Sequence, residues 1–194
     1  MKRYFYLLLA AIALRAQAPT DAEIRAMLME RIDKMHQNVG IAAGIVDANG
    51  RRFVSYGNFS VKDPRPVGND TVFGIGSTTK VFTSTILADM VQRGEVSLDD
   101  PVAKYLPADV KIPQRDGRQI TLIDQATHTS GLPRMPANFA PQDSGNPYSD
   151  CTLANLFQFL SSYELTRDIG SKFEYSNMGV ALPGQALAHR AGMD

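Results

Sequence analysis

The chain has 194 residues, with 20 Lys and Arg against 20 Asp and Glu, so its formal net charge is zero. This length is enough for one domain with a hydrophobic core, and the 44% apolar content excludes a collagen-like or disordered chain. No basic cluster indicates a nucleic-acid partner. Cys151 is the only cysteine, so no internal disulfide can form, and we expect its thiol to be a small buried apolar group.

Residues 1–18 have the pattern of a secretory signal peptide. Lys2 and Arg3 precede an apolar run over residues 4–14, and Ala16-Gln17-Ala18 is a small-x-small cleavage site. The run is too short to cross a bilayer, which takes about 20 residues. We therefore expect cleavage after Ala18, export to the periplasm or the exterior, and no membrane span in the mature chain. An uncleaved N-terminal anchor is the alternative.

The first elements after this leader are a predicted helix over residues 21–38 and a β-hairpin over residues 41–57. Thr20 and Glu23 have the spacing of a capping box at the start of the helix. Asn49-Gly50 is the preferred sequence for a two-residue hairpin turn. Apolar residues recur at helical spacing and predict the buried face of the helix, its methionines included: Ile24, Met27, Leu28, Ile32 and Met35.

The rest of the chain is mostly predicted helix. The first helix runs from Ser77 to about Gln92, and apolar residues cover so much of its circumference that it should be buried. Later helices are predicted at 121–128, 152–161 and 178–191, around a long loop at 131–150. No later segment reads as a strand, although a lone hairpin is only marginally stable. The fold class is therefore α+β.

Ser77-Thr78-Thr79-Lys80 forms an S-x-x-K tetrad at the start of a predicted helix. Residues three apart share a helical face, about 5–6 Å between Cβ atoms. A serine hydroxyl needs a neighbour to accept its proton, and a lysine can do this when neutral, which burial near other cations favours. Backbone N–H groups at the helix start can stabilise negative charge on a substrate oxygen. Alone, the tetrad also fits an exposed N-cap serine with a solvated lysine.

Tyr175-Ser176-Asn177 is the second chemical motif. A tyrosine beside a lysine can act as an acid or base, and an asparagine amide can donate to a substrate carbonyl while accepting from the lysine. Tyr56-Gly57-Asn58 has the same pattern, but it ends the predicted hairpin strand, where an aromatic residue is expected to pack. We therefore assign the function to the later motif.

The chain resembles the serine β-lactamase and penicillin-binding protein superfamily, and most of all its class C β-lactamase-like members. The resemblance covers residues 21–194, and several blocks in the same order carry it. These blocks are Phe73-Gly74-Ile75-Gly76-Ser77-Thr78-Thr79-Lys80, residues 94–102, Lys104-Tyr105-Leu106-Pro107, Ile120-Thr121-Leu122, His128-Thr129-Ser130-Gly131-Leu132-Pro133 and Phe173-Glu174-Tyr175-Ser176-Asn177-Met178-Gly179.

The resemblance implies a β-lactamase/DD-peptidase-like fold and a serine hydrolase that works without a metal or cofactor. Ser77 would be acylated, with its N–H as half of an oxyanion hole, and Lys80 would accept its proton. Tyr175 would be a general base or proton relay, and Asn177 would contact the substrate and Lys80. The substrate would be a small molecule or peptide (a β-lactam, an ester or a D-amino-acid peptide amide) and the protein a monomer.

The resemblance also implies that residues 19–194 are the N-terminal part of a longer domain, without most of the central antiparallel sheet. The family's third motif, Lys or His followed by a small residue and Gly, is not found after Asn177. His128 precedes Tyr175 and ends a helical segment, so we interpret it as structural. We expect negligible turnover by residues 19–194 alone. A non-catalytic penicillin-binding or sensing module, or an inactive truncated product, is the alternative.

Overall fold

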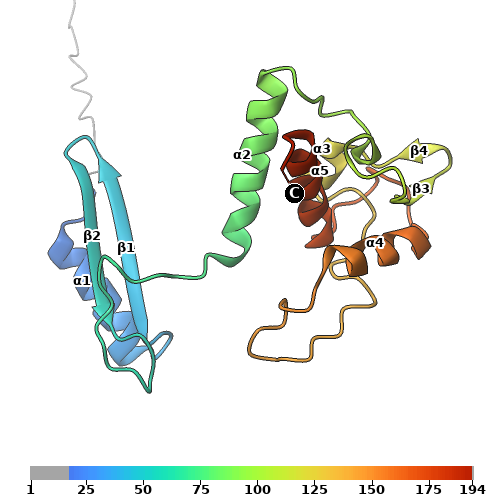
Figure 1. Cartoon of the computed structure of the whole chain (residues 1–194). Helices are drawn as coiled ribbons and strands as arrows, with labels where there is room; N and C mark the ends of the chain where they lie inside the picture. Colours follow the sequence, from blue (N-terminus) through green and yellow to red (C-terminus); the bar gives the residue numbers. More distant parts are fainter. Residues whose placement is uncertain (1–17, 194) are drawn as a thin grey trace, which may run out of the picture. The chain divides into compact units, whose positions relative to one another are not determined.

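The structure is a computed structural model that describes residues 18–193 and divides into two compact units, which meet in sequence between Gly74 and Ile75. In Figure 1 the first unit is coloured blue to teal and the second green to red. The predicted leader peptide lies outside the described residues, apart from Ala18. No helix among the described residues is long and apolar enough to cross a membrane.

The first unit begins with helix α1 (Asp21–Met29), which continues as the π-helical turn η1 (Glu30–Lys34). The predicted capping box is present, because the Thr20 side chain accepts from the Glu23 N–H and the Glu23 carboxylate accepts from the Thr20 N–H. The helix ends short of the predicted residue 38. Its buried side chains are Ile24 and Leu28 alone, which pack against the hairpin.

The prediction that the methionines of this helix are core residues is wrong. Met27 and Met35 are 47% and 53% exposed, since the hairpin offers the helix only a narrow apolar face. Ile24 and Leu28, one turn apart, occupy that face and leave the neighbouring positions to solvent.

The hairpin consists of β1 (Gly40–Asp47) and β2 (Gly50–Gly57), paired antiparallel with Gly40 opposite Gly57 and Asp47 opposite Gly50. Its turn is Ala48-Asn49, one residue earlier than the predicted Asn49-Gly50. The Asp47 carboxylate accepts a hydrogen bond from the Asn49 N–H at 2.8 Å, and this side-chain-to-backbone bond favours a turn that starts at Asp47.

The second unit is built around helices, as predicted. The turn η2 (Gly76–Thr78) leads into α2 (Thr79–Gln92), and the short turn η3 (Val102–Tyr105) follows. The later helices are α3 (Leu122–Ala126), α4 (Leu153–Ser162) and α5 (Met178–Arg190), and residues 131–150 contain neither helix nor strand. These positions confirm the four predicted helices of this unit.

Two short strands of the second unit were not predicted. β3 (Gln114–Arg115) pairs antiparallel with β4 (Arg118–Gln119), and Asp116-Gly117 forms the turn between them. Asp-Gly is a strong hairpin signal, so this element could have been found in the sequence. Both sheets in residues 18–193 are thus two-stranded and antiparallel, which agrees with a partial α+β fold.

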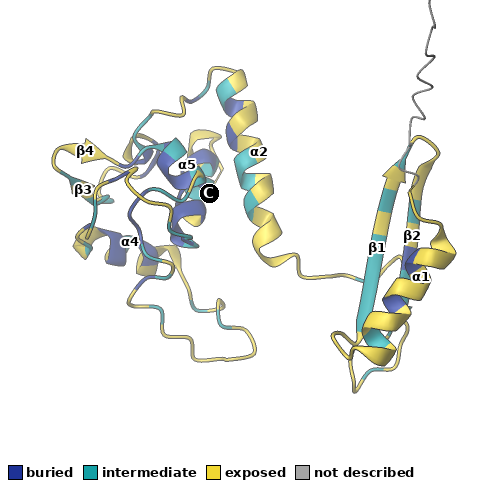
Figure 2. Ribbon diagram, turned by 180° about the vertical axis from the view of Figure 1, so that it is seen from behind, coloured by how far each residue is buried: buried dark blue, intermediate teal, exposed yellow. Residues whose placement is uncertain are grey.

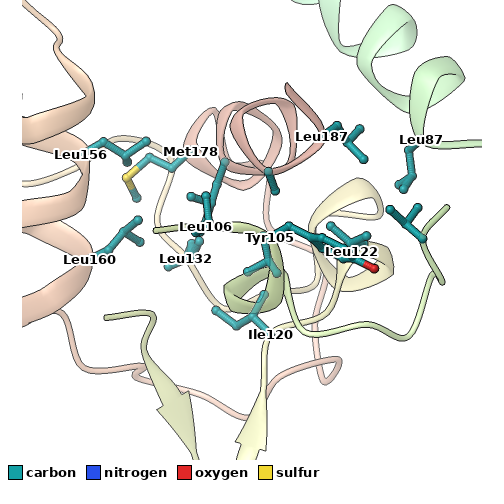
Figure 3. Packing of buried hydrophobic residues seen from close by; sticks show 14 of the residues in the cluster. Leu87, Tyr105, Leu106, Ile120, Leu122, Leu132, Leu156, Leu160, Met178 and Leu187 are labelled. Carbon is teal, nitrogen blue, oxygen red and sulfur yellow. The ribbon is translucent and has the colours of Figure 1, made fainter. Parts of the chain in front are cut away.

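The core of the second unit forms around α5. Leu182 and Ala186 are fully buried on this helix, and Figure 3 shows Met178 and Leu187 of α5 between side chains of α4 and of α2. The core members labelled there are Leu87, Tyr105, Leu106, Ile120, Leu122, Leu132, Leu156, Leu160, Met178 and Leu187. This packing fixes the start of α5, where the second chemical motif lies.

Helix α2 is less buried than its composition predicted. Leu87 and Met90 face the core, whereas Val81, Phe82 and Ile86 are 63%, 59% and 53% exposed. Figure 2 shows exposed yellow along much of α2. The prediction of an all-round buried helix is therefore wrong for the described chain. Its apolar residues do lie on several faces, but the described residues cover only one of them.

Candidate active site

Ser77 and Lys80 lie where the turn η2 passes into α2. Ser77 is in the 3-10 turn, Lys80 is in the first turn of the α-helix, and the Lys80 Nζ donates to the Ser77 Oγ at 3.3 Å. Gly76, just before the serine, has a φ of +51°, a left-handed conformation that glycine adopts without strain. The glycine-rich approach therefore has a local role in presenting the serine.

Tyr175 and Asn177 reach the same place from the segment that leads into α5. The Tyr175 hydroxyl donates to the Ser77 Oγ at 2.7 Å, and the Lys80 Nζ donates to the Asn177 Oδ1 at 3.0 Å. The four residues selected from the sequence thus form one continuous hydrogen-bonded cluster. All four belong to the second unit, so the cluster is described within a single compact body.

Ser176, between the two, holds this segment in place and was not singled out in the sequence. It is fully buried, its Oγ donates to the Pro133 carbonyl at 2.7 Å, and the same Oγ accepts from the Gly179 N–H at 2.9 Å. A Cβ at Gly179 would lie 3.1 Å from the Ser176 Cβ, so a larger residue would crowd the serine. A small polar residue between Tyr175 and Asn177 was the only signal for this anchor.

The long loop meets the site at Arg134 and Met135. The Arg134 carbonyl accepts from the Asn177 N–H at 3.0 Å, and the Asn177 Nδ2 donates to the Met135 Sδ at 3.2 Å. The Arg134 guanidinium lies 5.1 Å from the centre of the Tyr175 ring. Within residues 18–193 no carboxylate pairs with this guanidinium.

Positive charge surrounds the Tyr175 phenol. The interactions with Lys80 and then with the Ser77 hydroxyl lower the pKa of Tyr175 from its usual value and outweigh the opposing effect of burial, while the Arg134 charge is the smallest of the lowering causes. The Lys80 Nζ also lies 5.0 Å from the ring centre. Because cations stabilise a phenolate, this environment makes the deprotonated form of Tyr175, the form that can accept a proton, more accessible than in a free tyrosine. The role of Arg134 was not predicted, since no spacing in the sequence connects it to Tyr175.

An apolar cavity of about 330 Å³ opens beside Asn177. It lies between the long loop, α4 and α5, and Met135, Tyr148, Leu153 and Cys151 are in its wall. Cys151 is exposed, which corrects the expectation of a buried thiol. Its position after the long loop, just before α4, keeps it out of the core.

The remaining candidate residues from the sequence lie outside the hydrogen-bonded cluster around Ser77. The Tyr56 hydroxyl donates to the Asp33 carboxylate in the first unit, so the Tyr56-Gly57-Asn58 pattern is a packing feature of the hairpin. His128 follows α3 and contacts the Tyr175 segment through its ring and its backbone. Among residues 18–193 no group of three or more His, Cys, Asp or Glu side chains is placed to hold a metal ion.

The sequence matches the profile of the β-lactamase family over residues 25–194. The D-alanyl-D-alanine-carboxypeptidase/endopeptidase AmpH of Escherichia coli K12 is 36% identical over 79% of this chain and 39% of its own length. A β-lactamase of Lysobacter lactamgenus is 31% identical over 89% of this chain and 42% of its own. The chain thus spans about two fifths of the length of these relatives.

Solved structures agree with this match. A β-lactamase/D-alanine carboxypeptidase from Yersinia pestis, complexed with citrate, superposes with a TM-score of 0.71 at 31% identity, over 89% of this chain and 49% of the other. A class C β-lactamase from Rhodobacter sphaeroides gives a TM-score of 0.66 at 31% identity, over 88% and 44%. These matches confirm the resemblance found in the sequence, and the chain belongs to the β-lactamase family.

Proposed function

We propose that the protein is a serine hydrolase that transfers an acyl group to Ser77 and then to water. The observation that carries this proposal is the hydrogen-bonded cluster of Ser77, Lys80, Tyr175 and Asn177. Tyr175 lies 98 residues from Ser77 in the sequence, and the fold nonetheless places the two side chains 2.7 Å apart. A nucleophile within reach of two proton-accepting groups is the arrangement that covalent catalysis requires.

The proposed reaction has two steps. In the first, the Ser77 Oγ forms a bond to the substrate carbonyl carbon, and its proton passes to Lys80 in its neutral form or to Tyr175 as phenolate, and on to the leaving group as the scissile bond breaks. In the second, the water oxygen forms a bond to the acyl carbon while its proton passes to the same group, and that proton then returns to the Ser77 Oγ as the bond to the acyl group breaks and the acid leaves. Both acceptors contact the Ser77 Oγ, at 3.3 Å for the Lys80 Nζ and 2.7 Å for the Tyr175 hydroxyl. The lowered pKa of Tyr175 supports its role as base or relay.

Asn177 and the cavity beside it would orient the substrate. The Asn177 amide oxygen accepts a hydrogen bond from Lys80, and the amide nitrogen donates to the Met135 sulfur. A thioether sulfur is a weak acceptor. A substrate carbonyl is a stronger acceptor, so it can replace the sulfur as partner of this N–H. The apolar cavity beside Asn177 would then take the acyl side chain.

The substrate proposed is a β-lactam, an ester or a D-amino-acid peptide amide, and the protein would act as an exported monomer. Two relatives support the first and third of these classes, because they are named as a β-lactamase and as a D-alanyl-D-alanine-carboxypeptidase/endopeptidase. Lys80 and Arg134 place two cations at the cluster and favour a substrate with an anionic group. Export rests on the leader pattern of residues 1–18.

A fluorescent penicillin tests the acyl-transfer step. We expect one molecule of label per chain, detected by gel fluorescence and intact mass, and no label on Ser77→Ala. The control is Ser84→Ala, which removes a serine further along the same helix and should label as the parent does. Labelling of Ser77→Ala at the parent rate would contradict the assignment of the nucleophile.

Turnover separates the enzyme from a binding or sensing module. A protein that spans the full length of the relatives would hydrolyse nitrocefin, a chromogenic ester or a D-alanyl-D-alanine peptide over many cycles if it is a hydrolase, whereas residues 19–194 alone should show negligible turnover. Stoichiometric labelling of the full-length protein with no turnover of any of the three would favour the non-catalytic alternative.

A further inference from the structure

His128 bonds to both residues that flank Tyr175. The His128 carbonyl accepts from the Glu174 N–H at 2.8 Å, and its Nδ1 accepts from the Ser176 N–H at 3.1 Å. The backbone on either side of Tyr175 is therefore tied to one residue. Such a pair of bonds fixes the direction in which the intervening side chain leaves the chain.

The imidazole also packs on the phenol itself. Its ring centre lies 4.6 Å from that of Tyr175 at an interplanar angle of 31°, and 5.6 Å from that of Phe173 at 82°. Stacked and edge-on aromatic pairs at these distances are favourable beyond their buried area. His128 thus contacts Tyr175 by its ring as well as by the neighbouring backbone.

The backbone of His128 is held in a strained conformation. Its φ is +59°, in the left-handed region that a non-glycine residue rarely adopts. Strain of this kind persists only where surrounding contacts determine the geometry. The two bonds to the Tyr175 segment are contacts of that kind, so the observed ring position depends on them.

The bond from Ser176 fixes the protonation state of the ring. A backbone N–H can donate only to a ring nitrogen that carries no hydrogen, and a doubly protonated imidazole has no such nitrogen. The bond therefore requires neutral imidazole with its hydrogen on Nε2. Burial first, and then the charge of Lys80, lower the pKa of His128 and keep it neutral.

The charged groups around this pair come from three elements. Lys80 of α2 lies over the Tyr175 ring and its charge acts on His128, and Arg134 of the long loop lies over the Tyr175 ring. Glu174, in the segment itself, is paired with Arg167 at 2.6 Å. Protonation of His128 would add a third cation here and replace the acceptor opposite the Ser176 N–H by a donor.

We propose that His128 is a positioning residue for Tyr175, and that its neutral Nε2–H imidazole holds the phenol within hydrogen-bond reach of Ser77. The inference rests on the proposed function for the use of Tyr175, but it adds a residue that touches neither Ser77 nor a substrate. When His128 takes up a proton, the bond to Ser176 is lost and the Tyr175 segment loosens.

Two substitutions separate the contribution of the hydrogen bond from Ser176 from that of ring stacking on Tyr175. His128→Asn keeps an acceptor near the position of Nδ1 and tolerates a left-handed backbone, but it loses the ring. His128→Phe keeps a ring and loses the acceptor. His36→Asn is the matched control, because His36 also has a positive φ, +50°, and lies in the first unit.

The readouts are nitrogen-15 shifts of the His128 ring, hydrogen exchange of the Ser176 amide and carbon-13 shifts of the Tyr175 Cζ. We expect neutral Nε2–H imidazole at neutral pH, and Ser176 protection that is lost as His128 titrates. His128→Phe should speed Ser176 exchange by about tenfold, the upper range for one hydrogen bond, and His128→Asn by less. His36→Asn should change neither shift nor exchange at the site.

A His128 ring with its hydrogen on Nδ1 at neutral pH would overturn the proposal, as would unchanged Ser176 exchange in a folded His128→Phe. The ring measurement needs no variant, so it decides even if His128→Phe does not fold. Penicillin labelling separates this inference from the proposed function. Labelling that depends on Ser77 but has the same rate and pH profile in His128→Phe would remove only the positioning role, since the acyl-transfer assignment would stand.

Discussion

The hydroxyl of Tyr175 donates a 2.7 Å hydrogen bond to the Oγ of Ser77, although the two residues lie near opposite ends of the second unit in the sequence. Lys80 and Asn177 share a second bond between the same two segments, at 3.0 Å. The turn that carries Ser77 and Lys80 is thus joined to the segment just before α5 by two contacts.

Lys80→Met should slow acylation of Ser77 by penicillin by about 100-fold or more, the lower range for loss of a positioned proton acceptor. The change removes the donor to both Ser77 and Asn177, and it should also raise the pKa of Tyr175, because Lys80 is the largest cause of its lowering. Labelling kinetics measure the first effect. Lys111→Met, at an exposed lysine, is the control and should label normally.

Arg134→Gln should raise the pKa of Tyr175 by less than Lys80→Met does, because the Arg134 charge is the smaller cause. A lowered pKa in the folded state makes stability increase with pH between that pKa and the usual value, and this stability is lost as pH falls. The increase in the free energy of unfolding at alkaline pH should therefore be smaller in Arg134→Gln than in the parent. Tyrosinate absorbance and urea unfolding measure the two effects, and an unchanged Tyr175 titration would refute the influence of Arg134. Arg51→Gln, in the first unit, is the control.

Asp100→Asn should lower the free energy of unfolding by about 1–2 kcal/mol at neutral pH, since the carboxylate accepts three hydrogen bonds. Their donors are Tyr105, Lys104 and the Ser97 N–H, which together lower the pKa of Asp100 to about 2.

The effect of Asp100→Asn on the free energy of unfolding should depend on pH. The contribution of Asp100 is complete above the unfolded value of 3.8 and is lost as pH falls towards about 2. The difference between the parent and Asp100→Asn in urea unfolding should therefore shrink below about pH 4. Asp109→Asn, at an exposed site, should show no such convergence.

Leu182→Ala should destabilise the chain by about 2–5 kcal/mol, because it empties space in the core around α5. Leu182 is fully buried. Phe82→Ala removes a larger side chain, but one that is exposed on α2, and should change stability by about 0.5 kcal/mol or less. Urea unfolding of both variants checks the contrast. A large loss in Phe82→Ala would show that the exposed face of α2 is covered in solution.

Modification of Cys151 should slow acylation by donors with a bulky acyl side chain more than by donors with a small one. The thiol is exposed in the wall of the cavity beside Asn177, so a thiol reagent can attach there and fill that space. Labelling rates before and after modification measure the effect. Cys151→Ser treated with the same reagent is the control, and an equal slowing of both donor classes would argue against an acyl pocket.

Features that depend on near neighbours in sequence could be predicted. The capping box at Thr20 and the proximity of Ser77 and Lys80 follow from spacing within one helical turn, and both are present. Tyr175 could be connected to Ser77 only through the family resemblance, because no local rule relates residues on different elements. The same reason explains why Arg134 and Ser176 were missed.

Burial was predicted less well than secondary structure. Helical spacing shows which face of α1 or α2 is apolar, but a face is buried only where another segment packs on it. Met27 and Phe82 both satisfy the spacing and are exposed, since the described residues do not cover them. The hairpin turn lies one residue before the predicted one for a local reason. The hydrogen bond to the Asp47 side chain outweighs the general preference for Asn-Gly in the turn.

The two bonds from Ser176 and Asn177 to the carbonyls of Pro133 and Arg134 fix the stem of the long loop. Beyond Met135 the loop contains no helix or strand up to residue 150, and it forms part of the wall of the cavity beside Asn177. Sequence change in that stretch can therefore reshape the cavity without moving Ser77. If the cavity takes the acyl side chain, as we propose, substrate range would diverge through a segment that carries none of the four residues of the hydrogen-bonded cluster.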